Sequence, residues 1–78
     1  MKIHVFAVLK DYMPTEQELE ISSVTDIASL KEALKKQYPS AGVLLDTCRF
    51  ASEKEILSLD KIITDYEHIY VIPPSSGG

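Results

Sequence analysis

One amphipathic helix limits what this chain can fold into. The segment SSVTDIASLKEALKKQYPS, residues 22–40, repeats apolar residues at helical spacing. Ser23, three residues before Asp26, predicts a capping-box start, and Thr25 is an alternative cap. Pro39 ends the helix, because the residue before a proline disfavours helical backbone. The predicted stripe consists of Ile27, Leu30, Ala33, Leu34 and Tyr38. A helix with one such stripe must cover one face of another layer.

The remaining segments predict a β-sheet as that layer. Residues 2–9 are apolar on both faces, which indicates a central strand, and residues 17–21 alternate as a second strand. Residues 48–57 predict a short hairpin with a charged turn, and residues 68–72 predict the last strand. A short helical turn is expected near residues 41–46. The order ββαβ(β)β predicts an α+β fold, a β-grasp, in which the first and last strands lie side by side.

Composition excludes several functional classes. The chain has 78 residues, enough for one domain, and a net charge of −4, which argues against nucleic-acid binding. No apolar run is long enough to span a bilayer, and no signal peptide is recognisable, so we expect a cytoplasmic protein without membrane contact. Its single cysteine, Cys48, excludes an internal disulfide and is expected to be a partly buried apolar residue.

Two histidines require a separate interpretation. His4 and His68 are expected on neighbouring central strands, where they could form a metal-binding or acid–base pair. A third ligand is missing from the pattern, so structural roles are favoured and no metal site is predicted. The turn that contains Glu53 and Glu55 is interpreted as a solvated loop.

The chain finishes with YVIPPSSGG, so residues 1–72 form the predicted domain and residues 73–78 an extended tail. Pro73 and Pro74 stop the last strand and favour stiff polyproline II backbone. Ser75 and Ser76 are small and polar. A Gly/Ser linker has a similar composition, but the two prolines favour an arm that is presented to a partner.

The last two residues determine what such an arm can do. Gly77 and Gly78 have no Cβ, so the backbone can thread a narrow channel and present a terminal carboxylate. Adenylation with ATP would convert this carboxylate into an acyl donor, and a sulfur nucleophile could then displace AMP to give a thiocarboxylate. The sequence shows no phosphate-binding loop, no Ser/His/Asp set and no paired catalytic carboxylates. We therefore expect a carrier without a catalytic site or bound cofactor of its own, whose ATP is used by a partner enzyme.

Three segments, KIHVFAVLKD, LKKQYP and YVIPPSSGG, resemble the small, sulfur-carrying subunit of molybdopterin synthase. The resemblance implies a β-grasp fold and a heterotetramer with a large catalytic subunit. It also implies a ubiquitin-activating-like adenylyltransferase and a sulfur donor protein as partners. Gly78 would be adenylated and converted to the thiocarboxylate, and its sulfur would pass to cyclic pyranopterin monophosphate during molybdenum cofactor biosynthesis.

The resemblance is weaker in two loops. The segment RFASEKEI has Ser52 near the position of a usual Asn, and DYE, residues 65–67, replaces a usual Asp-Gly-Asp turn. Tyr66 lacks the freedom of glycine at positive φ, so a different turn type is expected.

An exposed apolar surface is predicted on the sheet face opposite the helix. Phe6, Ile56 and Ile72 are expected there, and with residues 73–76 they form the predicted partner-binding set. Two alternatives remain open: a sulfur carrier for another pathway, such as thiamine synthesis or tRNA thiolation, and a ubiquitin-like protein-interaction module.

Overall fold

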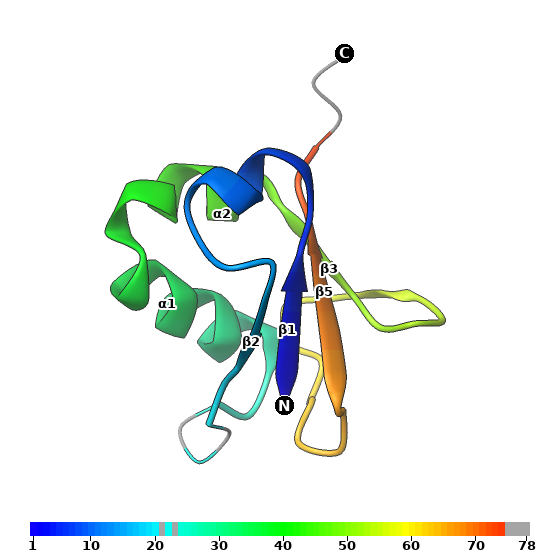
Figure 1. Ribbon diagram of the computed structural model, residues 1–78. Helices are drawn as coiled ribbons and strands as arrows, with labels where there is room; N and C mark the ends of the chain where they lie inside the picture. The colour runs from blue at the N-terminus through cyan, green and yellow to red at the C-terminus, as the bar shows by residue number, and fades with distance from the viewer. Residues whose placement is uncertain (21, 23, 75–78) are drawn as a thin grey trace.

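The sheet has five strands in the spatial order β2-β1-β5-β3-β4. The computed structural model describes residues 1–20, 22 and 24–74 (Figure 1). β1 and β5 pair in parallel, and the other neighbours are antiparallel. The predicted adjacency of the first and last strands and the β-grasp arrangement are therefore confirmed. The strands are β1 (Lys2–Val5), β2 (Glu16–Glu18), β3 (Arg49–Ala51), β4 (Ile56–Leu57) and β5 (His68–Ile72).

Helix α1 (Ile27–Gln37) begins later than the sequence suggested. Its cap is Asp26, whose Oδ1 accepts a hydrogen bond from the Ser29 backbone N–H at 2.9 Å. The Ser29 hydroxyl accepts in return from the Asp26 N–H at 3.1 Å, which completes a capping box. The prediction that Thr25 caps the helix is wrong, and the other predicted cap, Ser23, lies outside the described residues. The predicted stop before Pro39 is confirmed.

The chain continues from α1 through a 3₁₀ turn, η3 (Pro39–Ala41), into the short helix α2 (Gly42–Thr47). Both helices lie on the same side of the sheet (Figure 1). The core fills the space between these layers, and its largest fully buried side chains come from β1, β5, α1, α2 and the adjoining loops. They are Ile3, Val5, Leu9, Val24, Ile27, Leu30, Leu34, Leu45, Ile63, Ile69 and Val71.

The first strand is shorter than predicted. β1 ends at Val5, and Ala7 has φ 54, a left-handed backbone angle that is uncommon for any residue except glycine. This residue turns the chain into the 3₁₀ helix η1 (Ala7–Asp11), which buries Leu9 completely. Leu9 therefore reaches the core from a helical turn, although its spacing from Ile3 and Val5 fits a strand equally well.

The second strand was predicted over residues 17–21, but β2 covers Glu16–Glu18. Leu19 is half-buried against the core and Glu20 is exposed, as the alternation indicates. Ile21 lies outside the described residues.

The two loops that depart from the molybdopterin-synthase pattern are well-defined turns. In the hairpin between β3 and β4, the Ser52 hydroxyl accepts hydrogen bonds from the backbone N–H groups of Lys54 and Glu55, each at 3.2 Å. Ser52 thus closes the turn by its side chain, as short polar residues commonly do. In the turn before β5, Tyr66 packs against the core, and its N–H donates to the Ile63 carbonyl at 3.0 Å. Tyr66 has no positive φ, so this turn does not require glycine.

Candidate functional site: an open sheet face and the root of the tail

The tail leaves the end of β5. Because β1 and β5 are parallel, this end lies beside the turn that carries Phe6 and Ala7 (Figure 1). Pro73 is buried, so it packs within the domain. Pro74 is exposed, so the chain faces solvent again from this residue. Residues 75–78, which include Ser75, Ser76, Gly77 and Gly78, lie outside the described residues, and their roles stay predictions.

The sheet face opposite α1 carries exposed apolar side chains. Phe6 is 42% exposed, Ile72 38% and Ile56 55%. Tyr70 lies among them: its ring centroid is 6.2 Å from that of Phe6, and it shares a cross-strand row with Ala51 and Ile56. We call the surface formed by Phe6, Tyr70, Ile72 and Ile56 the open face. Phe6, Ile56 and Ile72 therefore occupy the predicted face, and their partner-binding role stays a prediction.

Tyr70 is a member of this surface that the site prediction missed. The signal was available, because Tyr70 alternates with the buried Ile69 and Val71 along β5.

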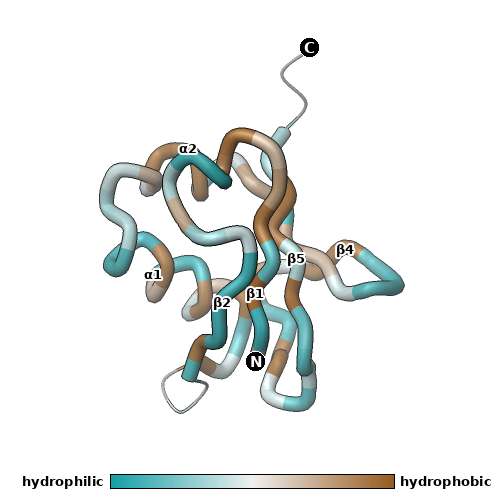
Figure 2. The backbone as a smooth tube through the Cα atoms, in the orientation of Figure 1, coloured by the Kyte–Doolittle hydropathy of each residue, from teal (hydrophilic) through white to brown (hydrophobic). Residues whose placement is uncertain are grey.

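Figure 2 shows hydrophobic backbone positions along β1 and β5, and hydrophilic positions at the hairpin beyond β4 and in the turn before β5.

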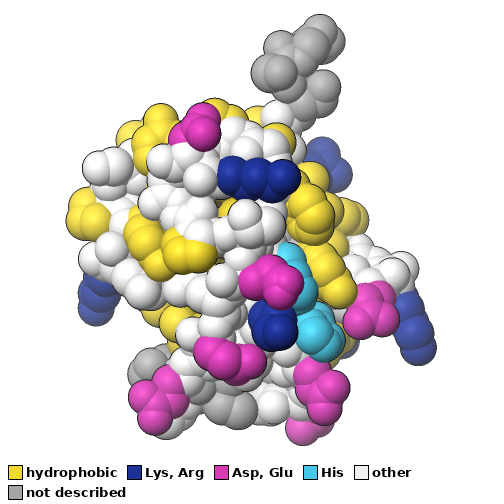
Figure 3. All heavy atoms as spheres, in the orientation of Figure 1, with side chains coloured by type: hydrophobic (Ala, Val, Ile, Leu, Met, Phe, Trp, Pro, Cys, Tyr) yellow, Lys and Arg dark blue, Asp and Glu magenta, His cyan; other side chains and the backbone are white. Residues whose placement is uncertain are grey.

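The two histidines lie together on the same face. His4 Nε2 and His68 Nδ1 are 2.9 Å apart, within hydrogen-bonding distance. The His4 ring also stacks on Tyr70, with centroids 4.7 Å apart and planes inclined by 17°. Figure 3 shows both histidines beside a column of hydrophobic side chains. The described residues contain no group of three or more potential metal ligands. The two rings are held by their hydrogen bond and by the stacking on Tyr70, and their structural role stays a prediction.

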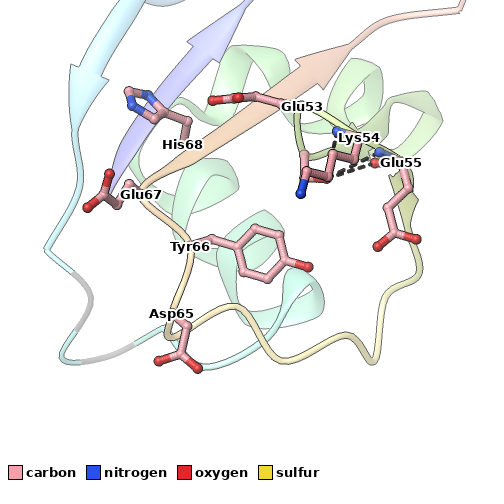
Figure 4. A pocket seen from close by; sticks show the side chains of 8 residues that line it. Glu53, Lys54, Glu55, Asp65, Tyr66, Glu67 and His68 are labelled. Atoms are coloured by element: carbon pink, nitrogen blue, oxygen red, sulfur yellow. Dashed lines mark hydrogen bonds between the residues drawn. The ribbon is translucent and has the colours of Figure 1, made fainter.

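An acidic hollow of about 540 Å³ lies beyond His68, between the β3–β4 hairpin and the turn before β5. Its acidic side chains are Glu53 and Glu55 from the hairpin and Asp65 and Glu67 from the turn, and we call these four residues and their hollow the acidic notch. Figure 4 shows Glu53 extended toward His68 and the Tyr66 ring between the two loops. None of the four carboxylates forms a salt bridge with another described residue. The sequence indicated a solvated loop for Glu53 and Glu55, and nothing in the pattern brings them beside Asp65 and Glu67.

Cys48 does not have the environment of a nucleophile. It is half-buried, and its thiol donates a hydrogen bond to the Leu44 carbonyl at 3.2 Å. Burial raises the pKa of the Cys48 thiol to about 11, so the reactive thiolate is scarce near neutral pH.

The described residues also contain no helix long and apolar enough to cross a membrane.

Comparison with known families decides what kind of protein presents this face and tail. The model of the ThiS family matches residues 3–78, nearly the whole chain and including the Gly-Gly finish. The chain belongs to the ThiS family. This family consists of ubiquitin-like sulfur carriers, so that part of the resemblance noted in the sequence is confirmed.

A solved structure supports the fold of this ThiS-family protein. SAMP1 from Haloferax volcanii superposes with a TM-score of 0.76 at 19% sequence identity, and the match covers 99% of this chain and 97% of that one. Such low identity shows the shared β-grasp fold alone. No curated protein matches the chain by sequence.

Proposed function

We propose that this ThiS-family protein is the sulfur-carrier subunit of molybdopterin synthase, acting in the cytoplasm. The observation that carries the proposal is the joint occurrence of family membership and a strand that runs directly into Pro-Pro-Ser-Ser-Gly-Gly. The fold supports it, because β5 directs Pro74 away from the domain at the edge of an exposed apolar face.

The proposed chemistry takes place at the carboxyl group of Gly78. An activating adenylyltransferase joins this carboxylate to AMP and releases pyrophosphate from ATP. A sulfur donor protein, with a thiol as reductant, releases hydrosulfide, which forms a C–S bond at the Gly78 carbonyl carbon while the C–O bond to AMP breaks and AMP leaves. The resulting thiocarboxylate donates sulfur to cyclic pyranopterin monophosphate in the large subunit, and water restores the carboxylate. This carrier supplies the tail and the docking surface, and its partners supply the catalytic groups.

Intact-mass spectrometry tests this proposal. The purified protein is incubated with the adenylyltransferase of the same organism, ATP and a sulfide source. We expect its mass to rise by the difference between sulfur and oxygen, and we expect no rise for a variant that lacks Gly78. A Gly78-deleted protein that still supports pterin sulfuration would refute the carrier role.

A second measurement identifies the pathway. The sulfur-loaded protein is mixed with the large synthase subunit and cyclic pyranopterin monophosphate, and molybdopterin formation is followed. Loading with sulfur but delivery only to a thiazole precursor or to tRNA would replace the molybdopterin assignment by another sulfur-carrier pathway. Phe6→Asp is expected to weaken binding of the large subunit, because it places a charge in the open face.

A further inference from the structure

The open face and the acidic notch form one continuous surface. Phe6 contacts the Tyr70 ring, Tyr70 stacks on His4, and His4 bonds to His68. His68 in turn lines the acidic notch. This row of four rings therefore runs along β5. It begins near Ile72, where the tail leaves the sheet, and ends at His68, beside the acidic notch.

The two ends of this surface differ in chemistry. The end near the tail is largely apolar, with Phe6 and Ile72 exposed, and its charged side chain is a cation, Arg49, which pairs with Ile72 across β3 and β5. The other end carries the four carboxylates of the acidic notch and two cations: Lys54 within the notch, and Lys2 beside His68, where it lies 3.8 Å from Glu16. The carboxylates lack salt bridges within the described chain, so they keep their capacity to pair with external cations.

We propose that the open face and the acidic notch together dock a protein whose apolar patch is flanked by Arg or Lys side chains, and that the notch receives these cations. This inference rests on the proposed function, since the partner we assign to the surface is the activating adenylyltransferase. Charge complementarity selects this occupant: an acidic partner would place like charges against Glu53 and Glu67, which is costly at an interface.

Two different contacts also fix the orientation of the carrier. Burial of apolar rings supplies affinity without direction, whereas pairing at the notch determines which end of β5 faces which part of the partner. With the notch held, the opposite end of β5 and the root of the tail at Pro74 point toward the partner's adenylation site. The charges also attract the partner over a distance of about one Debye length, so docking depends on ionic strength.

Kinetics of adenylation test the inference with matched charge changes. The notch variant is Glu53→Gln with Glu67→Gln, and the control is Glu20→Gln with Glu32→Gln, which alters net charge equally at exposed sites away from the surface. Pyrophosphate release by the adenylyltransferase is measured against carrier concentration in low salt and in high salt. We expect the KM for the notch variant to rise about tenfold in low salt, and this difference to shrink in high salt. The control is expected to keep the wild-type KM.

Each other outcome has a distinct meaning. Equal KM values for the notch variant, the control and the wild type would overturn the docking inference and leave the carrier function intact. A rise shared by the control would also overturn it, because net charge alone would then explain the effect. Absence of adenylation in the wild-type protein would refute the proposed function itself. Circular dichroism and urea unfolding of both variants establish that the folded domain is being compared.

Discussion

The left-handed turn at Ala7 should be a source of strain that a single substitution relieves. Ala7 has φ 54, where an L-residue with a Cβ costs about 1–2 kcal/mol. Glycine removes this cost but loses about 0.5–1 kcal/mol more backbone entropy on folding. The Ala7 side chain is exposed, so its deletion leaves no cavity. Ala7→Gly should therefore increase the free energy of unfolding by about 0.5–1 kcal/mol, which raises Tm by about 2–8 °C in a domain of this size.

Two other variants make the test specific. Ala7→Val should lower stability by about 1–2 kcal/mol, because a β-branched residue is strongly disfavoured at positive φ. Ala28→Gly, the same chemical change within α1, should lower stability by up to about 1 kcal/mol. Urea unfolding at constant pH measures all three. A destabilised Ala7→Gly protein, or an Ala7→Val protein as stable as the wild type, would show that this backbone conformation does not carry the assigned strain.

Three further predictions concern the helical layer. Leu34→Ala removes a fully buried side chain and should cost about 2–5 kcal/mol in urea unfolding; a loss below about 1 kcal/mol would contradict its place in the core. The hydrogen bond from Lys35 lowers the pKa of Asp46 below 3.8, so its stabilising contribution is complete above that value and is lost as pH falls through the lower folded pKa. Asp46→Asn should therefore reduce stability near neutral pH and have a smaller effect in strong acid, and a pH-independent difference would disprove the linkage. The Cys48 thiol, with its pKa of about 11, should react with a disulfide reagent at mildly alkaline pH roughly a hundredfold more slowly in the folded protein than in urea, and equal rates would contradict its burial.

The sequence alone predicts an element correctly where its apolar spacing fits only one kind of secondary structure. The stripe of Ile27, Leu30 and Leu34 has no β alternative, and these three residues are fully buried. The alternation along β5 likewise placed Ile69 and Val71 inward. In both α1 and β5, the local spacing of apolar residues alone determines which side chains face the core.

Other features depend on contacts between distant segments. The sequence suggested two caps for the helix, Ser23 and Thr25, whereas the cap is Asp26. The helix start at Asp26 coincides with the bridge of this residue to Ile62 and with the hydrogen bond from Ile27 N–H to the Lys61 carbonyl. The end of β1 was ambiguous because Leu9 reaches the core either from a strand or from η1. The acidic notch joins residues 52–55 to residues 65–68, which only the β3–β5 pairing brings together.

The two faces of the sheet make stability and the proposed docking separable. The face toward α1 carries fully buried apolar side chains, so substitutions there act mainly on the free energy of unfolding. The open face carries side chains such as Phe6 and Ile56 that remain exposed in the isolated domain, so their replacement removes little burial from the fold. Their apolar area gains its full stabilising effect only when a partner covers it. The proposed carrier, which would bind several partners in turn, benefits from this division, because the proposed docking surface can change while the core beneath it stays intact.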